Sequence, residues 1–138
     1  MGNGKNPKNV PAPLSGEMNI LSGKVIDSAF AIHKALGPGL LESVYEICLT
    51  HELKKKEFKV ERQVEVPIYY DGLKFDAGFR IDLLVDDHLI VELKAVEVVL
   101  PVYEAQLLTY LKLCGKRLGL LINFNVPVLK DGIKRIIL

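Results

Sequence analysis

The stretch RIDLLVDDHLIVELK, residues 80–94, places two apolar runs on either side of Asp86-Asp87-His88 and predicts a β-hairpin. A three-residue turn at this position sets Asp82 directly opposite Glu92, and directly opposed residues share a face of the sheet. A two-residue turn instead sets Asp82 opposite Val91 and places the two carboxylates on opposite faces. The length of the turn therefore decides whether the two acids meet.

Three charged groups interrupt these apolar strands. Glu92 and Lys94 are two residues apart and point the same way, so the longer turn brings Asp82, Glu92 and Lys94 together. Charges in an apolar strand are usually paired or bound to metal, and neighbouring carboxylates favour Mg²⁺ or Mn²⁺ over zinc. Such an ion activates water and stabilises charge on a phosphate, which is the chemistry of phosphodiester hydrolysis. The alternative is a surface lysine–carboxylate pair on a half-exposed sheet, which these three residues alone favour.

Outward from this hairpin, the hydrophobic periodicity predicts an α/β fold in a single domain, with a mixed β-sheet flanked by helices in the order α-α-β-β-β-α-β and a small tail strand. Predicted helices cover residues 19–36, 41–56 and 102–114, and predicted strands cover residues 60–68, 74–85, 89–95, 118–124 and 133–138. In the second helix, Leu41 is expected on the apolar face. In the third helix, the expected buried stripe is Leu107, Leu108 and Leu111.

Residues 1–17 are rich in Gly, Asn, Pro and Lys, and we expect a flexible leader ahead of a domain at residues 18–138. One explanation of this composition is a vector-derived leader, with Met18 as the natural start; the other is a native leader.

The chain has 18 Lys and Arg against 17 Asp and Glu, a formal charge of +1, which argues against a strongly basic nucleic-acid coat but permits a local basic groove. The densest basic run is Lys54, Lys55, Lys56, Lys59 and Arg62, which we interpret as a solvated helix end rather than a phosphate-binding track. The two cysteines form neither a disulfide scaffold nor a zinc site, which suits a cytoplasmic protein. No apolar run is long enough to span a membrane.

A longer pattern accompanies the charged residues. The segment GLLESVY at residues 39–45 matches G-x-x-E-x-x-Y, and with Asp82 and the segment Glu92-Leu93-Lys94 it resembles the GxxExxY protein family, a branch of the PD-(D/E)xK nuclease superfamily. The resemblance extends from Met18 to Leu138. It implies a restriction-endonuclease-like core and a nuclease that uses Mg or Mn and acts on DNA or RNA. Ile81 stands where the superfamily's name has proline, a position without a ligand.

The resemblance also implies roles for single residues. Asp82 and Glu92 are similar to the metal-binding carboxylates, and the backbone carbonyl of Leu93 is a further ligand. Lys94 is similar to the lysine that orients the attacking water. Glu42 is similar to an extra helix acid near the metal.

Three residues on helices extend this expected site. Gln106 and Tyr110 resemble the Q-x-x-x-Y motif of RecB-type nucleases beside the active site, at the margin of the third helix's buried stripe. The alternative is a surface pair that merely caps the sheet. Tyr45 shares a helix face with Glu42, which favours a role in the site. A core aromatic with a satisfied hydroxyl is an equally expected interpretation of Tyr45.

A second hypothesis is a catalytically silent binding or assembly module that keeps the acids for structure or for a regulatory cation. The chain lacks an obvious DNA-clamping subdomain, which fits a protein that works with a protein partner or as a homodimer.

Overall fold

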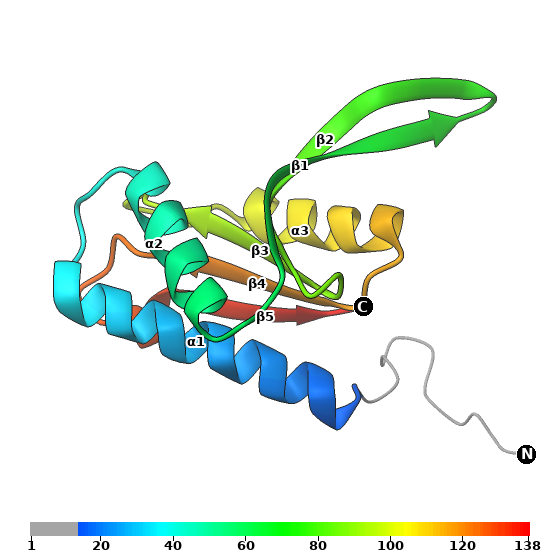
Figure 1. Cartoon of the computed structure of the whole chain (residues 1–138). Helices are drawn as coiled ribbons and strands as arrows, with labels where there is room; N and C mark the ends of the chain where they lie inside the picture. Colours follow the sequence, from blue (N-terminus) through cyan, green and yellow to red (C-terminus); the bar gives the residue numbers. More distant parts are fainter. Residues whose placement is uncertain (1–13) are drawn as a thin grey trace, which may run out of the picture.

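The computed structural model describes residues 14–138, which form a five-stranded sheet in the order β1-β2-β3-β4-β5 with helices on both faces (Figure 1). The predicted α/β order is confirmed, and a short 3-10 helix, η1, is added before the last strand. The elements are α1 (Gly16–Leu36), α2 (Glu42–Lys55), β1 (Val60–Tyr70), β2 (Leu73–Val85), β3 (Leu89–Lys94), α3 (Pro101–Cys114), β4 (Leu118–Asn123), η1 (Leu129–Gly132) and β5 (Ile133–Ile137).

The first helix begins earlier than its apolar spacing indicates. The Ser15 side chain accepts a hydrogen bond from the N–H of Met18 at 3.2 Å and caps the helix, so Gly16 and Glu17 are helical. Both were assigned to the leader, whose residues 1–13 lie outside the described part of the chain. Composition alone does not distinguish a serine that caps a helix from a serine in a flexible segment.

The helices divide the core into two clusters. The larger cluster lies between the sheet and the pair α1 and α2, and the smaller one lies under α3. Two predicted core positions are wrong. Leu41 is 73% exposed because it caps α2 and lies before its first turn, and Leu108 is 42% exposed because it points away from the sheet. Leu107 and Leu111 are buried as predicted.

The register of the central hairpin is the one that a three-residue turn predicts. Val85 pairs with Leu89, and antiparallel pairing continues to Leu83 opposite Val91. Asp86 and Asp87 have φ of 50° and 60°, the left-handed conformation that Asp tolerates in turns. On its other side β3 pairs in parallel with β4, so it is a central strand, while β5 forms one edge of the sheet.

Beyond the sheet, β1 and β2 continue together as a two-stranded arm (Figure 1). The pairing of β2 with β3 ends at Leu83, so the outer part of β2 has only β1 beside it. The arm shows large apolar side chains to solvent near its tip, namely Tyr69, Tyr70, Leu73 and Phe75. The root of this arm is the point where β2 leaves β3, and Asp82 lies at that point.

Candidate active site

Asp82 and Glu92 join β2 to β3 where the backbone ladder between these strands stops. The backbone N–H of Asp82 donates to Glu92 Oε2 at 2.8 Å, and the N–H of Leu93 donates to Asp82 Oδ2 at 2.9 Å. In each bond a side-chain carboxylate therefore accepts the hydrogen bond that a backbone carbonyl of the same strand would accept in a regular ladder. The predicted meeting of the two acids is confirmed, and one oxygen of each is left outside these two bonds.

Glu92 is buried and Asp82 half-buried, and neither has an ion-pair partner. Glu92 is 7% exposed, and burial followed by the charge of Asp82 raises its pKa to about 8. Burial also raises the pKa of Asp82, against the opposing effect of the Leu93 N–H. Within residues 14–138, no Lys, Arg or His nitrogen lies within 4.0 Å of either carboxylate. Ionising both carboxylates therefore creates negative charge that the protein itself does not neutralise by ion pairing.

Glu42 and Lys94 lie within electrostatic range of this pair. Burial and then the charge of Asp82 raise the pKa of Glu42, and Lys94 opposes that rise. Lys94 also acts on Asp82 and Glu92, and its ammonium lies 4.4 Å from the ring centroid of Tyr103. The sequence motifs did not indicate Tyr103, which lies in the first turn of α3. A short connection joins β3 to α3 and brings this turn close to Lys94.

The predicted pair on α3 forms, with Gln106 exposed and Tyr110 deeper than expected. Gln106 Nε2 donates to the Tyr110 hydroxyl at 2.6 Å. Tyr110 is 9% exposed and its ring stacks on Phe79 at 4.2 Å between centroids, so it belongs to the core rather than to the margin of the buried stripe. Burial and then the charge of Glu92 raise the pKa of Tyr110, which places its hydroxyl in the field of the acid pair.

Tyr45 is a core aromatic with a satisfied hydroxyl. The hydroxyl donates to the carbonyl of Gly37 at 2.7 Å and accepts from the N–H of Leu40 at 3.1 Å. Its ring stacks on Phe124 with 4.3 Å between centroids and 6° between planes. Tyr45 therefore anchors the loop that leads into α2, and α2 begins at Glu42.

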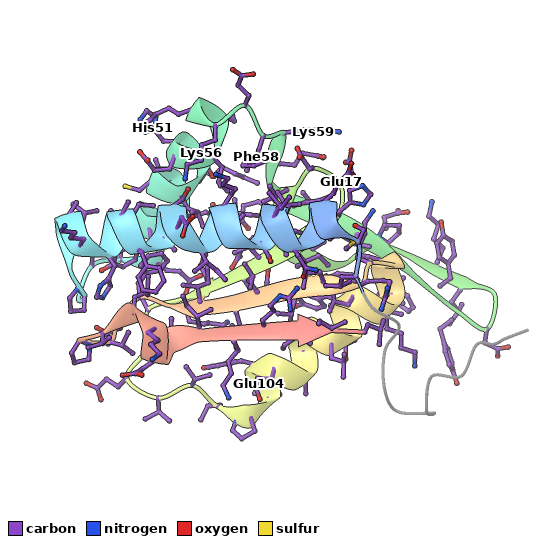
Figure 2. All side chains as sticks on the ribbon, turned by 90° about the horizontal axis from the view of Figure 1, so that it is seen from below. Glu17, His51, Lys56, Phe58, Lys59 and Glu104 are labelled. Atoms are coloured by element: carbon purple, nitrogen blue, oxygen red, sulfur yellow. The ribbon has the colours of Figure 1, made fainter. Side chains whose placement is uncertain are left out.

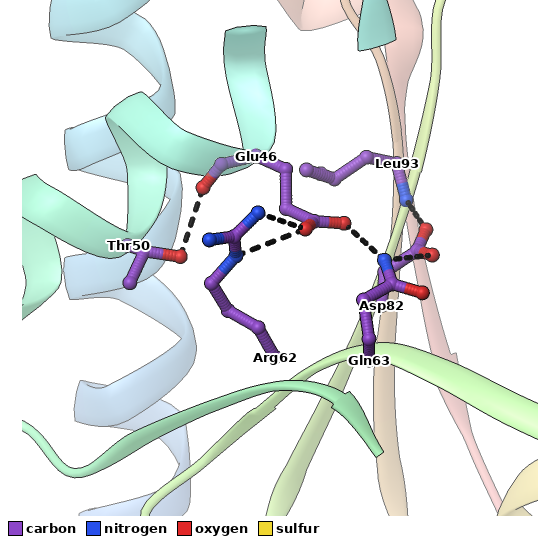
Figure 3. A network of polar contacts seen from close by, with 6 residues as sticks. All are labelled: Glu46, Thr50, Arg62, Gln63, Asp82 and Leu93. Atoms are coloured by element: carbon purple, nitrogen blue, oxygen red, sulfur yellow. Dashed lines mark hydrogen bonds and ion pairs between the residues drawn. The ribbon is translucent and has the colours of Figure 1, made fainter. Parts of the chain in front are cut away.

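An ion pair between exposed Arg62 and buried Glu46, which the sequence motifs did not indicate, lies beside Asp82 (Figure 3). Glu46 is 5% exposed, and its Oε2 accepts from Arg62 Nε at 3.0 Å and Nη2 at 2.9 Å. Gln63 Nε2 donates to Glu46 Oε1 at 2.6 Å and reaches Asp82 Oδ1 at 3.5 Å. Glu46 follows Glu42 by four residues, one helical turn, and this spacing was the available signal.

The residues of the basic run all lie at the surface. The Arg62 side chain is 42% exposed, although its guanidinium also pairs with buried Glu46. Lys59 pairs with Glu61 and Asp87 and stays largely exposed. In Figure 2 Lys56 and Lys59 lie on the side of the molecule opposite Glu104 of α3. Exposure of the whole run agrees with the solvated helix end that the sequence predicts.

The comparisons with known proteins agree with this geometry. Residues 19–136 match the family model of the PD-(D/E)XK nuclease superfamily. No curated protein and no solved structure gives a significant match. Within residues 14–138, no helix has the length and apolar character needed to cross a membrane.

Proposed function

Because the chain belongs to the PD-(D/E)XK nuclease superfamily, we propose that it is a divalent-metal-dependent nuclease that hydrolyses phosphodiester bonds of DNA or RNA. Nucleases of this superfamily generally use divalent cations. The observation that carries the proposal is the reciprocal bonding of Asp82 and Glu92 across adjacent strands, with Lys94 two residues beyond Glu92. This arrangement corresponds to the acid, acid and lysine pattern that names the superfamily.

The residues present fit a hard divalent cation. No three Asp, Glu, His or Cys side chains gather as a metal site in the described part of the chain. Mg²⁺ is commonly held by only one or two carboxylates, with water and substrate phosphate completing its shell. Half-buried Asp82 and buried Glu92 supply two carboxylates that lack an ion-pair partner, and we propose them as the ligands together with the Leu93 carbonyl and Glu42. Bound Mg²⁺ or Mn²⁺ supplies Lewis-acid stabilisation of phosphate charge.

We assign the remaining work to the side chains around the acids. Lys94 carries positive charge next to them, where it orients the attacking water and offsets charge that develops on the phosphate. Tyr103 limits the positions of the Lys94 ammonium through a cation–π contact. Gln106 and Tyr110 present a hydrogen-bonded pair on the α3 side of Glu92, suited to contact the substrate.

The direct test is cleavage of single- and double-stranded DNA and RNA with Mg²⁺ or Mn²⁺. We expect cation-dependent products that fall by at least about 100-fold in Asp82→Asn and Lys94→Met. The matched control is Lys55→Met, which removes an exposed lysine paired with Glu52 and should cleave like wild type. Absence of cleavage on every substrate, or undiminished cleavage by both variants, contradicts the proposal. Nucleic acid that sediments with the protein uncleaved would favour the silent binding module.

Within the superfamily, we propose that the chain belongs to the GxxExxY branch. The support is the segment at residues 39–45, whose tyrosine anchors the loop and whose glutamate begins α2 in the field of Asp82. The tyrosine and the glutamate of the motif thus both support the site, the tyrosine by holding the loop and the glutamate by its charge. We also propose a cytoplasmic location, which suits Cys48 and Cys114 as free thiols.

We propose further that the protein acts as a homodimer through the β1–β2 arm. Tyr70 pairs with Leu73 and Ile68 with Phe75, and these four side chains share one face of the arm because strand residues alternate. That face carries no charge, so two copies can pair by the same surface without repulsion. Sedimentation velocity should show a wild-type dimer and a Tyr70→Ser/Leu73→Ser monomer. A wild-type monomer at micromolar concentration contradicts the assignment.

A further inference from the structure

Gln63 occupies an unusual position in β1. Its neighbours Arg62 and Val64 pair with Leu83 and Ile81, so Gln63 stands opposite Asp82. Its φ of 52° is left-handed, a conformation that few residues other than glycine adopt. A strained backbone at this point needs a reason in the structure around it.

The two-stranded ribbon of β1 and β2 changes face at the pair of Gln63 and Asp82, so side chains that alternation would put on one face lie on opposite faces. Arg62 reaches Glu46 of α2, whereas Val64 packs in the cluster under α3, although regular alternation puts both on one face. On β2 the same change separates Leu83, in the larger cluster, from Ile81, in the smaller one. The change of face lies at Asp82, whose carboxylate turns toward β3 and bonds the N–H of Leu93.

The orientation of the Gln63 amide is fixed by its partner. A carboxylate only accepts hydrogen bonds, so the atom that lies 2.6 Å from Glu46 Oε1 is the amide nitrogen. Arg62 holds Glu46 in place through two contacts to Oε2. The second N–H of the same amide is free to face Asp82 Oδ1, at 3.5 Å.

We propose that Gln63 is a positioning residue for Asp82, held by Glu46 and Arg62 so that its amide orients Asp82 Oδ1. The Leu93 N–H already holds the other oxygen, so the two donors together set the plane of the carboxylate. Oδ1 keeps a lone pair for a divalent cation. The proposal rests on the proposed metal-dependent function, and it adds a residue outside the acid, acid and lysine pattern. Partners of this kind commonly change metal affinity by about 10- to 100-fold.

The experiment compares Gln63→Leu, Gln63→Gly and Gln63→Asn with wild type. Calorimetry measures the Mn²⁺ dissociation constant, and cleavage assays measure kcat and KM. We expect Gln63→Leu to weaken Mn²⁺ binding and to lower kcat at fixed Mn²⁺ by about 10- to 100-fold, with KM for nucleic acid little changed. Gln63→Asn retains a donor and tolerates a left-handed φ, so it should recover part of the loss.

Gln63→Gly separates positioning from folding. Glycine adopts a left-handed φ without strain, so this variant should unfold at a temperature close to that of wild type. Because it lacks the amide, its Mn²⁺ binding should be as weak as that of Gln63→Leu. The control is Glu61→Gln, an exposed neighbour on β1 that should leave both readouts unchanged. A folded Gln63→Leu or Gln63→Gly protein with wild-type Mn²⁺ affinity and kcat overturns this proposal alone. Wild-type protein that binds no Mn²⁺ overturns the proposed function as well.

Discussion

The N–H of Asp82 donates to the Glu92 carboxylate, and the residue after Glu92 donates its own N–H to the Asp82 carboxylate. Two side chains therefore bridge β2 and β3 where a pair of backbone carbonyls would normally do so. Each carboxylate is held in place by a backbone N–H of the neighbouring strand before any ligand arrives. Because Glu92 is buried, Asp82 is half-buried and their charges repel each other, their ionisation should be visible in the stability of the protein.

Stability without metal should fall as the pH rises from about 5 to above 8. The pKa of Glu92 rises from 4.5 to about 8 on folding, so the unfolded chain ionises first and unfolding releases a proton in this interval. The free energy lost is on the order of 4 kcal/mol if Glu92 acts alone. Urea unfolding at several pH values measures it. Glu92→Gln should flatten the curve, and an identical slope in both proteins would show that another group is responsible.

Mn²⁺ should stabilise the wild type and do so more strongly above pH 8, where Glu92 has lost its proton. A ligand at about 100 times its dissociation constant adds about 2.7 kcal/mol to the free energy of unfolding. Thermal unfolding with and without Mn²⁺ provides the measurement. Asp82→Asn should show little stabilisation, and an equal response in this variant would place the cation elsewhere.

Arg62→Met should destabilise the fold by about 2–4 kcal/mol, because it leaves the Glu46 carboxylate buried and unpaired. The double variant Arg62→Met/Glu46→Leu should recover much of this loss, since it removes both charges. Lys55→Met breaks the exposed pair with Glu52 and should cost less than about 1 kcal/mol. Chemical denaturation compares the three. Equal costs for Arg62→Met and Lys55→Met would refute the argument that the burial of Glu46 makes the loss of its partner costly.

Tyr45→Phe should cost about 1–3 kcal/mol, because the carbonyl of Gly37 and the N–H of Leu40 both lose their partner. The ring and its stacking on Phe124 remain. Tyr69→Phe removes an exposed hydroxyl from the arm and serves as the matched control, with an expected change within about 0.5 kcal/mol. Denaturant midpoints decide the outcome, and a Tyr45→Phe protein as stable as this control would show that the loop does not depend on the hydroxyl.

Local pattern was sufficient to predict the order of elements and the meeting of Asp82 with Glu92. Apolar period and turn residues act over a few positions, so the hairpin at residues 80–94 contains its own register once the turn has three residues. The pairing of Gln106 with Tyr110 likewise depends on spacing within one helix. These predictions needed no knowledge of distant segments.

Only the tertiary structure decided which groups surround the acids. Glu46 meets Arg62 across 16 residues, and Gln63 reaches Asp82 across 19, contacts that depend on how α2 packs against a ribbon that turns over. Tyr103 faces Lys94 because α3 returns along the sheet. The sequence determines the hydrophobic period of each strand. The position where the β1–β2 ribbon changes face depends instead on how its two faces pack against the helices, and this packing determines which polar groups surround Asp82.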